Sequence, residues 1–110
     1  MSKIALEIKR HEFVATCRAL SAAAKGSSMR KVTLRFEPQH LIIESDYGGG
    51  IVETDGSFSR EVRVTYGILS KIASLHRKEE DCGPFIKCIL DEDLGEIQFP
   101  RGGLKAKFVA

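Results

Sequence analysis

The amino-acid sequence predicts an α+β domain in which a β-α-β-β-β unit occurs twice, with two helices packed on mainly antiparallel sheets. Eight short segments alternate apolar and polar residues or are bounded by turn residues, as half-buried strands are. Two longer segments carry apolar residues at helical spacing. The order of these segments repeats after about half the chain. We therefore expect one domain over residues 1–110, with pseudo-repeats at about 1–59 and 60–110.

The first unit opens with a strand and a helix. Every second residue of the segment 3–9 is apolar, which predicts a half-buried strand. The helix that follows is expected to end at Gly26, because glycine is favoured just after the last helical turn. Its apolar stripe recurs at helical spacing and comprises Phe13, Cys17, Leu20 and Ala24, widened by Val14.

Three strands complete the first unit, at residues 31–37, 40–45 and 51–54. A turn at residues 38–39, where glutamine follows proline, joins the first two of these strands. Three consecutive glycines at residues 48–50 are expected to form the next turn, because glycine is common in turns and weakens strands.

The same order restarts at residue 60. The strands of the second unit are expected at residues 60–64, 85–93, 95–99 and 104–110. A helix is expected at residues 66–78, with a core-facing stripe of Ile68, Ile72 and Leu75 and with Leu69 beside it. A shift of 54 residues aligns Val32, Leu34 and Phe36 with apolar residues of the segment 85–93. The apolar pattern therefore repeats although the residues differ.

Charge alternates along the chain with the same period. Residues 10–36 hold six Lys or Arg and one acid, whereas residues 37–59 hold five acids and no Lys or Arg. Residues 60–78 again hold five Lys or Arg and one acid, and residues 79–96 hold seven acids and one Lys. The helical part of each unit is therefore basic, and much of its strand part is acidic.

The outward sides of both predicted helices carry basic and small residues. They are His11, Ala15, Arg18, Ala22 and Lys25 in the first helix, and Ser70, Lys71, Ser74, Arg77 and Lys78 in the second. Glu12 is the only acid in these helices and lies near the edge of this side. Such a face is either simply solvated or directed at something negative, and the charge pattern leaves both interpretations open.

The doubled unit resembles one domain of the DNA sliding clamps, the processivity rings of replicative polymerases. Residues 4–46 are similar to the first half of a bacterial clamp domain, and the stretches REVRVTYGILSKIASL and IKCILDEDLGEIQF resemble its second half. The resemblance covers essentially the whole chain and implies that both helices line a ring and face duplex DNA. It implies phosphate contacts that are independent of base sequence, made by Arg10, Arg18, Lys25, Arg30, Lys71, Arg77 and Lys78.

The resemblance also implies how copies of the chain would join. In clamps the last strand of one domain pairs with the fourth strand of a neighbour, and the corresponding stretches here are LKAKFVA and GGIVETD. The candidate interface residues on these stretches are Ile51, Glu53, Lys105 and Lys107. Clamps close from six domains on chains of two or three domains each, so a ring of this chain requires six copies. Duplex DNA, further copies of the chain, and replication or repair proteins are the expected partners.

An alternative function is open on the same fold. The chain is then a protein-interaction or adaptor module that binds a partner through an exposed strand edge without contacting DNA. Lys105 and Lys107 would be complementary in sign to Glu53 and Asp55 across such an interface, but lysines on an edge strand can equally protect it from pairing and keep the chain monomeric, and both interpretations stay open.

Enzyme, cofactor and metal chemistry have no support in the sequence. The glycines at 48–50 and 102–103 lack phosphate-loop spacing, and the acidic stretches ESD, EED and DED have no matching ligand set. We expect a non-enzymatic protein with no cofactor and no bound metal. Cys17, Cys82 and Cys88 show no CxxC spacing, so we expect reduced thiols in a cytoplasmic protein without a membrane segment.

Overall fold

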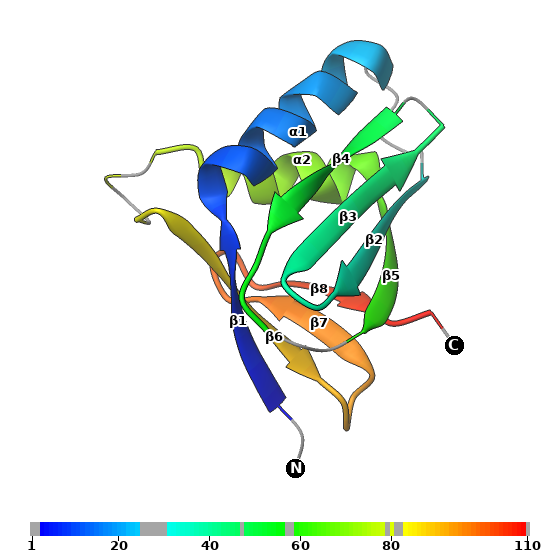
Figure 1. Ribbon diagram of the computed structural model, residues 1–110, viewed down its shortest axis with the longest axis vertical. Helices are drawn as coiled ribbons and strands as arrows, with labels where there is room; N and C mark the ends of the chain where they lie inside the picture. Colours follow the sequence, from blue (N-terminus) through cyan, green and yellow to red (C-terminus); the bar gives the residue numbers. More distant parts are fainter. Residues whose placement is uncertain are drawn as a thin grey trace.

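The computed structural model describes residues 3–24, 31–46, 48–56, 59–78, 80 and 83–109, with residues 21–24 described by their backbone, and these residues form eight strands and two helices (Figure 1). In chain order they are β1 (Lys3–Lys9), α1 (Arg10–Ala24), β2 (Lys31–Glu37), β3 (His40–Ser45), β4 (Gly48–Glu53), β5 (Arg60–Thr65), α2 (Tyr66–Leu75), β6 (Phe85–Asp91), β7 (Glu96–Phe99) and β8 (Leu104–Lys107). The predicted α+β class is confirmed. Within the described ranges, neither helix is long and apolar enough to cross a membrane.

The strands form two four-stranded antiparallel sheets. The first sheet has the order β1-β6-β7-β8, and the second has the order β4-β3-β2-β5. Each sheet therefore combines three strands of one sequence unit with the first strand of the other unit. β1 pairs with β6 along its whole length, and β5 pairs with β2. This exchange of first strands ties the two halves of the chain into one structure.

Backbone bridges connect the two sheets at both of their meeting edges. Ile8 bridges Thr54 where β1 approaches the end of β4, and Val62 bridges Phe108 where β5 approaches the end of β8. Adding 54 to both residue numbers of the first bridge gives the second. Hydrogen bonds beside the bridges follow the same shift: Asp55 N–H donates to the Glu7 carbonyl (3.2 Å), and Val109 N–H donates to the Glu61 carbonyl (2.8 Å). The backbone pairing therefore repeats with the offset of the apolar pattern.

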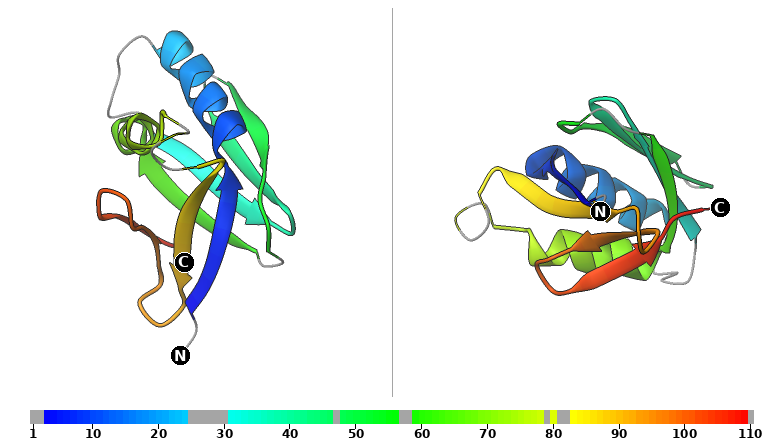
Figure 2. Two further views of the ribbon diagram at one scale, coloured as in Figure 1. Left: turned by 90° about the vertical axis from the view of Figure 1, so that its left-hand side faces the viewer. Right: turned by 90° about the horizontal axis from the view of Figure 1, so that it is seen from below.

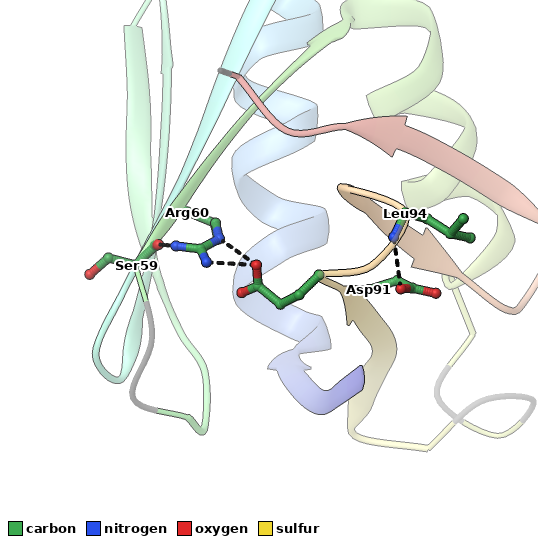
Figure 3. A network of polar contacts seen from close by, with 5 residues as sticks. Ser59, Arg60, Asp91 and Leu94 are labelled. Carbon is green, nitrogen blue, oxygen red and sulfur yellow. Dashed lines mark hydrogen bonds and ion pairs between the residues drawn. The ribbon is translucent and has the colours of Figure 1, made fainter. Parts of the chain in front are cut away.

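Side chains add a second link between the sheets near β5. The Arg60 guanidinium donates from Nε (3.1 Å) and Nη2 (2.6 Å) to one carboxylate oxygen of Glu92 in the β6–β7 turn (Figure 3). Its Nη1 donates to the Ser59 carbonyl (2.8 Å), and the carboxylate of Asp91, the last residue of β6, accepts the N–H of Leu94 in the turn (3.1 Å). Arg60 is therefore paired with an acid and is separate from the helical basic face.

Both helices and both sheets share one hydrophobic core. β2 and β6 bury alternate residues, as the sequence predicts, and α1 buries its predicted stripe as far as the side chains are described: Val32, Leu34, Phe36, Ile86, Cys88, Leu90, Phe13, Val14, Cys17 and Leu20. Each fully buried Leu, Ile or Phe side chain stabilises the fold by roughly 1.5–3 kcal/mol. The views of Figure 2 show the two helices next to each other, with the second sheet along one side of the pair.

The buried side of α2 differs from the prediction. The helix ends at Leu75 rather than at residue 78, and its buried residues are Tyr66, Leu69, Ile72 and Ala73. The predicted stripe members Ile68 and Leu75 are only partly buried. The buried side of α2 is therefore rotated relative to the predicted one. Tyr66 and His76, which apolar spacing does not mark as core residues, are buried at the two ends of the helix.

The prediction of a turn at residues 48–50 is also wrong. These glycines belong to β4, where Gly48, Gly49 and Gly50 pair with Ser45, Glu44 and Ile43. A Cβ atom on Gly49 would overlap the carbonyl oxygen of Ile43, and one on Gly50 would lie 3.0 Å from the Thr16 hydroxyl of α1. Glycine is required here because neighbouring backbone and a helix approach the strand closely.

Candidate nucleic-acid interface

The two helices run in opposite directions and are tied together at two points. Near the start of α2, the Tyr66 hydroxyl donates to the Cys17 carbonyl of α1 (3.2 Å). Beyond the other end of α2, Nη1 of Arg10 donates to the carbonyls of His76 (3.3 Å) and Arg77 (3.1 Å). Because both ends of α2 are bonded to α1, the surface between the two helices has a defined shape.

That surface contains a groove, a cavity of about 240 Å³ between α1 and α2. Its floor is formed by four buried residues, Val14, Cys17, Tyr66 and Ala73. Burial raises the pKa of the Cys17 thiol to about 12, so the thiol is neutral near pH 7. The floor therefore presents no negative charge.

The rim of the groove is positively charged. It is formed by the exposed residues Arg18 of α1, Ser70 and Ser74 of α2, and Arg77 just beyond α2. Lys71, the neighbour of Ser70, is also exposed. In the part of the chain that the structure describes, no carboxylate lies within ion-pairing distance of these three cations.

The only acid of α1 is turned away from the groove. The Glu12 carboxylate accepts the backbone N–H of Glu53 in β4 (2.8 Å). This bond anchors α1 to the edge of the second sheet and keeps the negative charge of Glu12 on the sheet side of the helix. Among the residues that the structure describes, the groove side of the helix pair is therefore basic.

The predicted DNA contacts fall into three groups. Arg18, Lys71, Arg77 and Lys78 are exposed. Lys25 and Arg30 lie outside the described residues. Arg10, the remaining predicted DNA contact, is only 9% exposed, and its guanidinium donates to the carbonyls of His76 and Arg77 after α2. A positive charge at a helix C-terminus is favourable, which explains the inward orientation of this residue.

His76 follows α2 and packs in the protein interior next to the guanidinium of Arg10, which donates to its carbonyl. It is 2% exposed, and its Nδ1–H donates to the Ile72 carbonyl (2.7 Å). Burial lowers the pKa of His76, the bond to Ile72 opposes this effect, and the charge of Arg101 lowers the pKa further. The folded protein therefore favours the neutral imidazole.

Acidification is expected to destabilise the protein through His76. The unfolded chain takes up a proton near pH 6.5, whereas the folded chain does so only at lower pH, so the free energy of unfolding falls as pH drops below about 6.5. The slope contributed by this residue approaches about 1.4 kcal/mol per pH unit. Urea unfolding of His76→Gln and of wild type between pH 7.5 and 5 measures this slope, which we expect to be smaller in the variant. An equal slope in His76→Gln and in wild type would contradict the expectation.

The predicted interface residues lie on the outer strands of the two sheets. In β4, Ile51 is 65% exposed, and the Glu53 carboxylate pairs with Lys9 (3.2 Å). In β8, Lys105 is exposed, and Lys107 pairs with Glu96 (3.5 Å). Two of the four residues therefore already have partners within the chain.

Along these outer strands, the backbone N–H and C=O groups of successive residues point alternately toward the neighbouring strand and away from it. The N–H of Thr54 donates toward β3 and that of Phe108 toward β7, whereas those of Asp55 and Val109 donate away from these strands. Because direction alternates along a strand, the odd-numbered residues of β4 and β8 present their backbone groups outward. The Glu53 N–H is covered by α1, so the outward groups of β4 are those of residues 49 and 51, and those of β8 belong to residues 105 and 107.

The sequence analysis did not predict the groove between the two helices. Tyr66, Ser70, Ser74 and Arg77 recur at near-helical spacing and share one side of the segment 66–78. This signal was present, but the floor also needs Cys17 of the other helix, and only the packing of the helices brings it there.

No three His, Cys, Asp or Glu side chains within the described ranges are placed to hold a metal ion. Comparison with known proteins finds no protein-family model, curated protein or solved structure that matches this chain.

Proposed function

We propose that the chain is a non-enzymatic, clamp-like protein that associates with duplex DNA through the face formed by α1 and α2. The observation that carries this proposal is the groove rim, where Arg18, Lys71 and Arg77 are exposed and no described acid pairs with them. A face of this kind is attracted to the phosphate backbone. Cations that pair with local acids would gain much less from such an encounter.

The contact is independent of base sequence. Direct readout of adenine depends mainly on Asn or Gln, and the chain contains no Asn. Its two Gln residues, Gln39 and Gln98, lie in a turn and in β7, away from the helices. The helical face instead offers Arg, Lys and Ser, which suit phosphate oxygens.

Self-association through β4 and β8 completes the proposal. Pairing β8 of one copy with β4 of the next uses the outward backbone groups of both strands and brings Lys105 near the acidic end of β4. Such a head-to-tail contact generates a ring when its rotation closes. By resemblance to the clamps, six copies would form that ring around the duplex.

The same free strand edges favour a second candidate function. An extended peptide from a partner protein can add to β4 or β8 as a further strand, with backbone hydrogen bonds supplying affinity. The chain is then an adaptor module, and its helical face is simply solvated. DNA binding separates this candidate from the first.

Fluorescence anisotropy with labelled duplexes tests the DNA association. Two duplexes of equal length and unrelated sequence should bind with equal affinity. The logarithm of the association constant should fall linearly with the logarithm of salt concentration, with a slope of about −3 for three phosphate contacts per copy. Absence of binding, or binding confined to one sequence, would contradict the proposal and favour the adaptor.

A further inference from the structure

The groove between α1 and α2 brings together four polar side chains that the sequence separates widely. Arg18 comes from α1, Ser70 and Ser74 lie one turn apart on α2, and Arg77 follows that helix. All four border one cavity of about 240 Å³. Pockets for drug-sized ligands span roughly 300–1,000 Å³, so this cavity suits a single small polyatomic group.

The chemistry of the rim selects an anion with several oxygen atoms. A guanidinium presents a planar fork of donors that matches phosphate oxygens, and the groove is bordered by two such groups, one from α1 and one from the segment just after α2. Serine hydroxyls donate to further oxygens of the same group. The neutral Cys17 thiol and the apolar floor add no competing negative charge.

Two arginines reduce the negative potential at the C-terminal end of α2, which borders the groove. Carbonyls at a helix C-terminus carry partial negative charge and would repel a phosphate. Here Arg10 donates to the carbonyls of His76 and Arg77, and Nε of Arg101 donates to the Leu75 carbonyl (2.7 Å). These two cations offset the repulsion. The bond from Arg10 also holds the backbone of Arg77 in place, which lowers the ordering cost of binding.

We infer that this groove is a phosphate-binding slot in which Arg18 and Arg77 hold one phosphate group from two sides while Ser70 and Ser74 donate to its oxygens. The inference rests on the proposed function, because if the chain binds duplex DNA, a DNA phosphate occupies the slot. The slot recognises the phosphate group itself. In DNA, this group is present both in each internal backbone linkage and at a phosphorylated 5′ end.

Titration of ¹⁵N-labelled protein with inorganic pyrophosphate at constant ionic strength tests the slot directly. Saturable shifts should be confined to backbone amides around the groove. Arg18→Gln with Arg77→Gln should weaken binding roughly tenfold or more, because each charge-assisted hydrogen bond is strong. Ser70→Ala with Ser74→Ala should weaken it several-fold without any change in net charge.

Matched controls separate a slot from a general attraction of anions. Arg63→Gln with Lys87→Gln removes two exposed cations from the outer sides of the sheets and should leave pyrophosphate binding unchanged. Shifts that do not saturate, or that weaken equally in both charge variants, would overturn the slot. A slot variant that loses its amide spectrum is replaced in the comparison by the serine double variant, since alanine favours the helix.

The two proposals fail separately. Pyrophosphate binding without duplex binding leaves the slot and removes the DNA function, whereas duplex binding without saturable pyrophosphate binding removes the slot alone. A comparison of linear duplexes with and without 5′-phosphates, and of closed circular duplex, identifies the source of the phosphate. If the serine double variant binds only the 5′-phosphorylated duplex less tightly, the occupant is a strand terminus. If it also binds circular duplex less tightly, the occupant is a backbone phosphate.

Discussion

Reversal of two charges on the helical face, Arg18→Glu with Lys71→Glu, is expected to weaken duplex binding by about 100-fold at low salt. The two substitutions remove two phosphate contacts and place two negative charges on the same surface. The slope of log affinity against log salt should become shallower by about 2, because one counterion is released for each contact. Anisotropy titrations across a salt series measure both quantities.

The control for this experiment carries the same change of charge on the opposite side of the molecule. Arg63→Glu with Lys87→Glu lies on the outer faces of the two sheets, and Arg63 alternates with the buried Val62 and Val64. Its duplex affinity should stay within a few-fold of wild type. If both double variants weaken binding equally, net charge rather than the helical face is responsible, and the assignment of the face to DNA is refuted.

Proline at one position of β8 is expected to abolish self-association without unfolding the chain. Lys105→Pro removes an outward N–H and leaves the hydrogen bonds to β7 in place, because those are made by the even-numbered residues. Proline is tolerated on edge strands for this reason. Light scattering across a concentration series should give the mass of one chain for the variant and a closed multiple, six by analogy with clamps, for wild type.

Lys105→Ala is the matched variant, since it removes the side-chain charge but keeps the N–H. We expect it to assemble, with some loss of affinity. Assembly that survives proline would show that the β8 edge is not the interface, and a wild-type monomer at all concentrations would remove the ring mechanism. A monomer that still binds a partner protein, and whose partner binding is lost in Lys105→Pro, would support the adaptor function.

Local periodicity in the sequence was sufficient to place most elements. The alternation in β1, β2 and β6 and the helical spacing of Phe13, Cys17 and Leu20 predicted both the elements and their buried sides. These patterns are local because each side chain's direction depends on its own position along the strand or helix. The positions of the exposed cations Arg18 and Lys71 were predictable for the same reason.

Residues with long-range contacts departed from the sequence prediction. Arginine is usually a surface residue, but the guanidinium of Arg10 donates to carbonyls just after α2. Gly49 and Gly50 were predicted to form a turn, but they pair with β3 as part of β4, and glycine stands there because β3 and α1 approach too closely for a side chain. His76 and Tyr66 rotate the buried side of α2 by filling space at its ends.

The sequence by itself determined the kinds and order of the elements, the two-unit repeat and a basic side on each helix, because these follow from the spacing of neighbouring residues. Only the tertiary structure decided that β1 and β5 exchange places between the units, that Glu12 turns its charge onto β4, and that Arg18 and Arg77 share one groove. Arg18 and Arg77 are 59 residues apart in the chain. Their juxtaposition depends on the bonds from Tyr66 to Cys17 and from Arg10 to the end of α2, which no local pattern specifies.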